Sequence, residues 1–215
     1  MTSTLTNKDA RFWDRIAPKY EAKPVPDEAV YREKLKLTQA LLNPNMEILE
    51  FGCGTGSTAI EHAPHVRHIL ATDFSRGMLE IAEGKAQAAG VSNVTFRQSS
   101  IERFEDAAER YDVVLALSIL HLVADREAAL AKIHSLLNPG GIFVSSTACI
   151  GEDMAWLGWI APLGKALGLL PNIEVFGREA FGADVTKAGF EILKSWSPGR
   201  GRGIFIIARK PGPSA

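Results

Sequence analysis

Three glycines alternate in the segment ILEFGCGTGSTAI, at Gly52, Gly54 and Gly56, directly after an apolar run and directly before a helical pattern. Glycine lets the backbone turn sharply and lets a ligand approach its amides, and the start of the next helix offers free N–H groups. Roughly 20 residues further on, Asp73 ends a second apolar run, where a carboxylate can accept both hydroxyls of a ribose. The spacing predicts an adenosine-containing ligand; the alternative is a tight turn that binds nothing.

The glycine spacing also bears on which adenosine ligand is expected. Dinucleotide-binding loops carry glycines at the first, third and sixth positions, whereas here the sixth position is Ser57 and Gly56 is the fifth. The chain also lacks the Tyr-x-x-x-Lys pair of short-chain nicotinamide enzymes. A nicotinamide-dependent oxidoreductase is therefore the first alternative, and a non-catalytic cofactor-binding partner subunit is the second.

The elements that would position this loop alternate along the chain as apolar runs and helical patterns, which is typical of βαβ units and a parallel sheet. We expect strands at 46–51, 66–72, 94–97, 112–117 and 141–146, and helices at 57–62, 75–89 and 125–137, the last ended by Asn138-Pro139-Gly140-Gly141. Two further runs, 190–196 and 204–209, are joined by a segment too short for a helix and predict a hairpin. Residues 9–43 predict two helices separated by a turn at 24–27.

The predicted fold class is therefore α/β: a Rossmann-like, doubly wound, seven-stranded sheet, mostly parallel, with a C-terminal antiparallel hairpin. We expect one domain over 1–215. Its parts would be an N-terminal helical cap (1–43), a cofactor-binding core (44–147), an apolar helical insert (148–175) and a last helix with the hairpin (176–215).

Four segments in order resemble the class I methyltransferases, and in particular their ubiquinone/menaquinone-biosynthesis-like (methyltransferase type 11/25) branch. ILEFGCGTG is similar to the first motif of the family, ATDFSRGMLEIA to its second-strand acid and following helix, YDVVLALSILHLV to its fourth strand, and LLNPGGIFV to the turn into its fifth strand. The resemblance implies S-adenosylmethionine as the cofactor, S-adenosylhomocysteine as the product and methyl transfer as the activity.

The same resemblance implies a role for each matching position. Glu50, Gly52, Cys53, Gly54 and Gly56 would surround the methionine half of the cofactor, and Asp73 would hold its ribose. The remaining positions would contact the adenine or the strand-four side of the cofactor: Phe74, Met78, Ser100, Ile101 and Leu117. Many relatives carry an Asp where this chain has Ser100, whose hydroxyl can still accept from the adenine amino group.

Methyl transfer needs alignment, exclusion of water and sometimes removal of one proton. Tyr20 stands where this branch has a tyrosine that closes over the cofactor, with a cation–π attraction to the sulfonium; the alternative is an aromatic packed under the first helix. His121 is expected to begin the helix after strand four and to take a proton from an acceptor hydroxyl; the alternative is a structural histidine. We name both as catalytic candidates.

The insert MAWLGWIAPLGKALGLLP is too long for a simple connection and too apolar for a solvated loop. Trp156, Trp159, Ile160 and Leu163 are the predicted acceptor-side residues of a lid, which favours a small apolar acceptor that is quinone-like, phenolic or lipid-like. Residues 154–170 leave open a peripheral membrane contact, and a helix that merely covers the sheet is the other alternative.

Composition excludes other classes. The formal net charge of −1 offers no surplus of cations for a nucleic acid, so we expect a small-molecule partner. Two distant cysteines and no basic-then-apolar start predict a reducing cytoplasm. His62, His65 and His68 recur every third residue, but Pro64 interrupts them and no carboxylate or cysteine joins them, so we predict no metal. The acceptor, the methylated atom (O, N or C) and the oligomeric state are not determined by the sequence.

Overall fold

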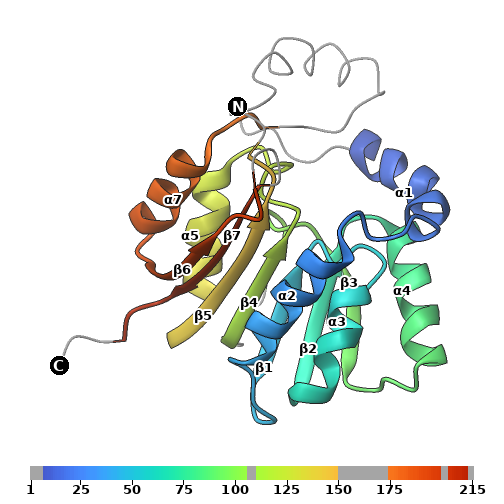
Figure 1. The fold of residues 1–215 in the computed structure, drawn as a ribbon. Helices are drawn as coiled ribbons and strands as arrows, with labels where there is room; N and C mark the ends of the chain where they lie inside the picture. Colours follow the sequence, from blue (N-terminus) through green and yellow to red (C-terminus); the bar gives the residue numbers. More distant parts are fainter. Residues whose placement is uncertain (1–6, 106–109, 150–173, 200–202, 213–215) are drawn as a thin grey trace.

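The computed structural model describes residues 7–105, 110–149, 174–199 and 203–212, and they build one seven-stranded sheet (Figure 1). Its strands are β1 (Glu47–Phe51), β2 (His68–Asp73), β3 (Val94–Gln98), β4 (Tyr111–Leu117), β5 (Leu137–Thr147), β6 (Glu191–Trp196) and β7 (Ile204–Arg209). They are ordered β3-β2-β1-β4-β5-β7-β6. The first five are parallel, whereas β7 runs antiparallel to both β5 and β6. The predicted mostly parallel sheet with a closing hairpin is confirmed.

Helices cover both faces of the sheet, as a doubly wound fold requires. They are α1 (Asn7–Glu21), α2 (Glu28–Gln39), α3 (Ser57–His62), α4 (Arg76–Ala88), α5 (Arg126–Leu136) and α7 (Arg178–Lys187), with a short 3₁₀ helix at Ala63–His65. One core cluster joins the sheet to α5 and α7. A second cluster joins the opposite face to α2, α3 and α4. The two predicted N-terminal helices are also observed, as α1 and α2.

One predicted boundary is wrong: β5 begins at Leu137, before the Asn138-Pro139-Gly140-Gly141 segment that was expected to be a turn. Leu137 is already extended and pairs with Tyr111. The backbones of Gly140 and Gly141 bond to Lys210. The Lys210 ammonium then caps the carbonyls of His134 and Leu137 at 2.8 Å each. Pairing with neighbouring strands, which no local pattern reveals, therefore extends this strand.

The N-terminal cap is fixed to the core by α1, which packs along α4. Asp14 of α1 accepts hydrogen bonds from the Ser75 hydroxyl (2.6 Å) and from the backbone N–H of Gly77 (3.0 Å), at the first turn of α4. A Cβ at position 77 would lie 3.2 Å from the Cα of Asp14, so glycine permits the close approach. The cap is thus held beside the end of β2, where the ligand is expected.

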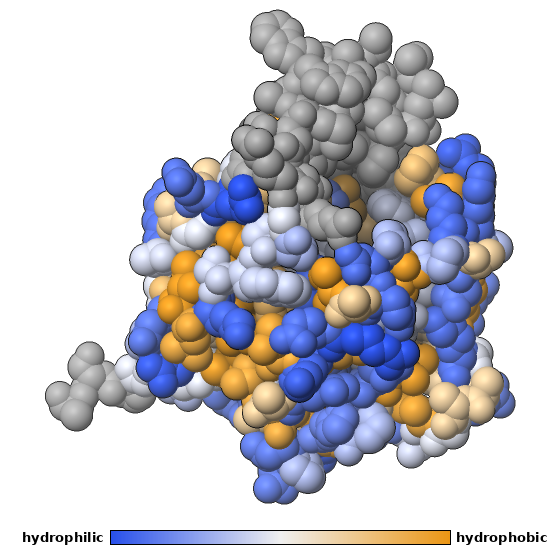
Figure 2. Space-filling model, in the orientation of Figure 1, coloured by the Kyte–Doolittle hydropathy of each residue, from blue (hydrophilic) through white to orange (hydrophobic). Residues whose placement is uncertain are grey.

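On the face seen in Figure 2, apolar residues gather over the sheet between the hydrophilic residues of α2 and those of α7. In the described part of the chain, no helix combines the length and the hydropathy needed to cross a membrane.

Candidate functional site

The site lies where the strand order reverses. From β1, the chain places β2 and β3 on one side and β4 and β5 on the other, so the connections after β1 and β4 leave in opposite directions. In open α/β sheets, ligands bind in the crevice at the carboxyl ends of the strands at this point. The glycine loop follows β1 directly, and Asp73 is the last residue of β2.

Asp73 and the glycine loop are joined by hydrogen bonds. The backbone N–H of Gly54 donates to one Asp73 carboxylate oxygen and that of Ser75 donates to the other, both at 2.9 Å. Burial raises the pKa of Asp73 and the charge of Asp14 adds to this, while the amide hydrogen bonds lower it. The carboxylate is thereby oriented before any ligand arrives, with lone pairs left for a ribose.

The three glycines are required for different reasons, although all have positive φ (66°, 53° and 76°). A Cβ at Gly52 would lie 2.5 Å from the Ile119 side chain, and one at Gly56 would lie 2.7 Å from the Cβ of Ala82. At Gly54, by contrast, a Cβ would meet nothing within 4 Å. Gly52 and Gly56 allow the loop to pack on its neighbours, whereas Gly54 borders open space that a ligand can occupy. The sequence did not reveal that Ile119 packs against the glycine loop at Gly52.

Among the residues of the candidate site, Glu50 has the least favourable surroundings in the absence of a ligand. Its side chain is 2% exposed, and its Oε2 atom has no hydrogen-bond partner among the described residues. Burial, together with the charge of Asp73, raises the pKa of Glu50 to about 8. An isolated buried carboxyl group is costly, so its retention beside the glycine loop fits a cofactor that brings a positive charge. Burial and the same two carboxyl groups raise the pKa of Cys53, which agrees with a packing role for that thiol.

Tyr20 lies near the ribose acid. Its side chain is half-exposed and stands edge-on to Trp13, with ring centroids 6.3 Å apart. Its pKa is raised by burial first and then by the charges of Asp73 and Glu21. Lys85 bridges Glu21 (2.9 Å) and the hydroxyl of Ser57 (2.7 Å), so the end of α1 is tied to the helix that follows the glycine loop. This position is compatible with the predicted closure over the cofactor.

The residues expected around the adenine differ in exposure. Phe74 is partly exposed, whereas Met78 and Ile101 are 2% and 1% exposed and lie in the protein interior. Ser100 is buried and its hydroxyl accepts from the backbone N–H of Arg103 at 3.4 Å. Phe74 is the member of this set with accessible surface for a flat ring, while Met78 and Ile101 are core residues.

Beyond the end of β4, Leu117 is partly buried and packs on the α2-side core. Ser118 follows it with φ of 59°, the one described non-glycine residue with positive φ. Its N–H donates to the carbonyl of Ser146 on β5 at 2.6 Å, which holds this conformation. Strained backbone of this kind concentrates at functional sites. No signal in the sequence pointed to Ser118, because αL conformation is not encoded by serine.

His121 does not begin a helix, contrary to expectation: it lies in a turn after β4, and α5 starts at Arg126 behind the cap residue Asp125. The Asp125 carboxylate accepts from the N–H of Ala128, a stronger start signal than any at His121. The Nδ1 atom of His121 is buried without a hydrogen-bond partner among the described residues. Burial lowers the pKa of His121 to about 4, so the imidazole is neutral near pH 7.

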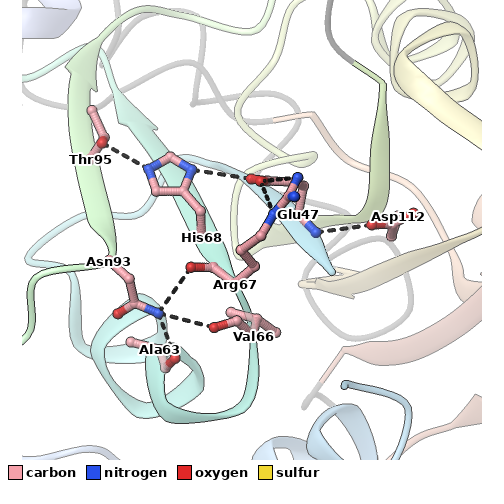
Figure 3. Close-up of polar contacts among 8 residues, drawn as sticks. All are labelled: Glu47, Ala63, Val66, Arg67, His68, Asn93, Thr95 and Asp112. Atoms are coloured by element: carbon pink, nitrogen blue, oxygen red, sulfur yellow. Dashed lines mark hydrogen bonds and ion pairs between the residues drawn. The ribbon is translucent and has the colours of Figure 1, made fainter. Parts of the chain in front are cut away.

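The predicted lid residues Trp156, Trp159, Ile160 and Leu163 lie outside the described residues, as does most of the insert. The three histidines weighed as metal ligands do not cluster. His62 is buried, whereas His68 bonds to Glu47 (3.2 Å) and Thr95 (2.8 Å) at the amino ends of the strands, on the edge away from the glycine loop (Figure 3). No group of His, Cys, Asp and Glu in the described ranges could hold a metal ion.

A sheet in this order, with a glycine-lined crevice and a ribose-type acid at its switch point, defines a Rossmann-like protein that binds a nucleoside-containing cofactor. The profile of the methyltransferase-domain family matches residues 42–166. The chain therefore belongs to that family, the class I S-adenosylmethionine-dependent methyltransferases, as its motifs predicted. The nicotinamide alternative finds no support in this match.

Individual relatives agree with the family. The chain is 37% identical over 102 residues to a ubiquinone biosynthesis O-methyltransferase of Azorhizobium caulinodans, covering 47% of this chain and 40% of that protein. It spans about half the length of the curated relatives it matches. The solved structure of N-methyltransferase NodS from Bradyrhizobium japonicum with S-adenosylhomocysteine has a TM-score of 0.71 at 17% identity, covering 97% of this chain and 100% of that one. The [4+2]-cyclase SpnF has a TM-score of 0.78 at 17% identity, covering 98% of both chains. Such distant structural likeness shows the fold alone.

Proposed function

We propose that this protein is an S-adenosylmethionine-dependent O-methyltransferase whose acceptor is a small apolar molecule with a phenolic, quinone-precursor-like hydroxyl. The observation that carries the proposal is His121, a neutral imidazole just beyond the carboxyl end of β4, whose buried Nδ1 has no hydrogen-bond partner among the described residues. A phenolic oxygen becomes a better nucleophile when a base removes its proton, and a neutral histidine within reach is the usual base.

The residues of the proposed site have separate roles in binding the cofactor. The cofactor supplies an electrophilic methyl group on a sulfonium. Asp73, pre-oriented by Gly54 and Ser75, binds the ribose hydroxyls, and the space beside Gly54 admits the cofactor. Tyr20 would close over it and offer an aromatic ring to the positive charge. The remaining cofactor contacts are those expected from the family: Glu50, Gly52, Cys53, Gly56, Phe74, Met78, Ser100, Ile101 and Leu117.

The bound cofactor would supply the methyl group, whose carbon would bond to the acceptor oxygen as its bond to sulfur breaks. His121 would take the proton that the hydroxyl loses, so the positive charge would pass from the sulfonium to the imidazole and leave with the proton to water. Closure of the site against water and alignment of the two reactants supply most of the acceleration. With a pKa of about 4, His121 is unprotonated over the whole neutral range but is a weak base, so it would accept the proton only as the new carbon–oxygen bond makes the hydroxyl more acidic.

Two further observations support an apolar phenolic acceptor. The relative from Azorhizobium caulinodans is called a ubiquinone biosynthesis O-methyltransferase, and the same description applies to one from Ruegeria pomeroyi, 31% identical over 102 residues. The sequence of 154–170, outside the described residues, is rich in Trp and Leu, as a cover for an apolar molecule requires. The same residues are our candidates for peripheral contact with a membrane, where such acceptors dissolve.

The proposal is tested with methyl-labelled S-adenosylmethionine and two acceptors that carry the same apolar tail, one a catechol and the other a primary amine. We expect label in the catechol, and kcat in His121→Gln reduced by about 10²- to 10⁴-fold with little change in cofactor affinity. His134→Gln, on α5, is the matched control and should retain activity. Label in the amine alone, or full activity in His121→Gln, would overturn the proposal.

The two alternatives are tested by thermal melting. S-adenosylhomocysteine should raise the Tm and NAD should leave it unchanged, because only a ligand of the native state stabilises it. Stabilisation by NAD would support an oxidoreductase. Stabilisation by S-adenosylhomocysteine without label in any acceptor of a metabolite and lipid extract would support a non-catalytic binding subunit.

A further inference from the structure

The turn that carries His121 is bonded to a distant part of the chain. The backbone N–H of Glu174 donates to the carbonyl of His121 at 2.8 Å. This bond fixes the backbone of His121, whereas the Nδ1 atom of its imidazole has no hydrogen-bond partner among the described residues. The direction of the imidazole therefore depends on how firmly the chain around Glu174 is held.

Arg126 fastens this chain to α5 and α7, which lie side by side on one face of the sheet (Figure 1). Its Nε and Nη2 atoms donate to the same carboxylate oxygen of Asp184, at 2.9 and 2.6 Å. Its Nη1 atom lies 3.9 Å from a carboxylate oxygen of Glu174, and its guanidinium carbon lies 3.9 Å from the centre of the Phe176 ring. One side chain thus joins the start of α5, the middle of α7 and the chain at 174–176.

Burial makes these contacts stronger than those of a surface ion pair. The side chains of Arg126 and Asp184 are 15% and 19% exposed, so solvent screens their attraction only in part. Phe176 is buried and packs on Phe181, with ring centroids 5.8 Å apart, in the core cluster between the sheet and the two helices. A guanidinium over such a desolvated ring adds a cation–π attraction.

The helix itself does not account for an arginine at this position. Arg126 is the first residue of α5, where the helix dipole disfavours a positive charge, and Asp125 already caps that end. A second ion pair, between Lys187 and Glu127, also joins α5 to α7, but its side chains are 68% and 64% exposed. The side chain of Arg126 is therefore explained by the chain that it holds, and Lys187 provides a matched comparison.

We propose that Arg126 is a positioning residue for His121: by holding the chain at 174–176, it keeps Glu174 bonded to the His121 carbonyl and the imidazole directed at the acceptor hydroxyl. Misplacing a reacting group by about 1 Å can cost about 100-fold in rate, so Arg126 acts on kcat without touching the substrate. The inference rests on the proposed function, because Arg126 acts through His121.

The first test is a double-mutant cycle on kcat. Arg126→Met removes the guanidinium, and kcat should fall by about 10- to 100-fold while the Kd of S-adenosylhomocysteine changes by less than about twofold. In the His121→Gln background the same substitution should change kcat by less than about twofold, because the group that Arg126 positions is gone. Lys187→Met, which breaks the exposed ion pair between the same helices, is the matched control and should retain the parent kcat.

Hydrogen exchange measures the positioning directly. The Glu174 amide should be protected in the parent and exposed to exchange in Arg126→Met, while the amides of β4 and β5 keep their protection. Val185→Ala, at a fully buried position of α7, should lower the Tm without removing the protection of Glu174. Arg126→Lys keeps a charge for Asp184 but cannot stack on Phe176; it should fold even where Arg126→Met does not, and show the same changes to a smaller extent.

Continued protection of Glu174 in a folded Arg126 variant, or an equal loss of protection in Val185→Ala, would overturn the role of Arg126. A fall in kcat of the same size in the parent and His121→Gln backgrounds would overturn it too, because the effect would then not pass through His121. Full activity in His121→Gln would overturn the proposed function instead, while loss of protection at Glu174 would still show that Arg126 holds this chain.

Discussion

The two edges of the parallel sheet treat their polar groups in opposite ways. At the amino ends of the strands, Glu47 pairs with Arg67 (2.6 Å) and His68 (3.2 Å), and its N–H donates to Asp112 (Figure 3). At the carboxyl ends, Glu50 is buried, its Oε2 has no partner in the described part of the chain, and Ser118 has strained backbone. The polar groups at the amino edge pair with one another, whereas the carboxyl edge leaves one buried carboxyl oxygen without a partner among the described residues, which supports our placing of the candidate site there.

The largest effect on ligand binding is expected from a side chain that fills the open space at the carboxyl edge of the sheet. Gly54→Val should abolish binding of S-adenosylhomocysteine, by more than about 100-fold in calorimetry, because the side chain occupies the ligand's space. Positive φ adds strain of about 1–2 kcal/mol, which the fold should survive. Gly90→Val is the matched control: its φ is also positive (68°) and a Cβ there also meets nothing within 4 Å. Tight binding in Gly54→Val would remove the loop from the site.

The second-largest effect on cofactor affinity is expected at Asp73, whose carboxylate accepts a hydrogen bond from the glycine loop. Asp73→Ala should weaken S-adenosylhomocysteine by about 1.5–3 kcal/mol, the range for hydrogen bonds to a charged group, and Asp73→Asn should lose less. The loss includes the disordering of Gly54 and Ser75, whose N–H groups lose their acceptor. Titration calorimetry measures both variants, and unchanged affinity in both would separate Asp73 from the ribose.

Glu50 predicts that the stability of the folded protein depends on pH. Its folded-state pKa of about 8 lies above the unfolded value of 4.5, so the folded protein binds the extra proton between these values. Stability should therefore fall as pH rises, by about 2 kcal/mol from pH 6 to pH 8 in the ligand-free protein. Glu50→Gln should flatten this slope in urea unfolding, and an identical slope in parent and variant would show that Glu50 is already ionised or compensated.

The smallest effects on stability and cofactor affinity are expected at the amino edge of the sheet, where the polar groups pair with one another. Glu47→Ala removes exposed ion pairs and should cost only about 0.5–1 kcal/mol of unfolding free energy, with cofactor affinity unchanged. Arg67→Ala, which removes the partner with a 66% exposed side chain, should cost no more. A change of cofactor affinity in either variant would mean that the two edges are coupled, contrary to the comparison.

Much of the site was predictable because it is local. Gly52, Gly54 and Gly56 lie within five residues of chain, and Asp73 follows at the end of the next strand, so alternation of apolar runs places all four at one edge. The closing hairpin was predictable for the same reason. The start of β5 and the place of His121 were not, since pairing with Tyr111 and Lys210 sets the first and the cap at Asp125 sets the second.

By itself the sequence determined the order of the elements and the family, and it predicted candidate residues around the cofactor, since each depends on motifs and periodicity within short stretches. Tertiary structure decided which of those residues border open space and which lie in the core: Gly54 is open, while Met78 and Ile101 are buried. It alone brought Lys34 of α2 to Ser146, 112 positions away, and left Oε2 of Glu50, beneath the same helix, without a partner among the residues that the structure describes. The physical reason is that burial and charge compensation are properties of neighbours in space, which a linear pattern does not specify.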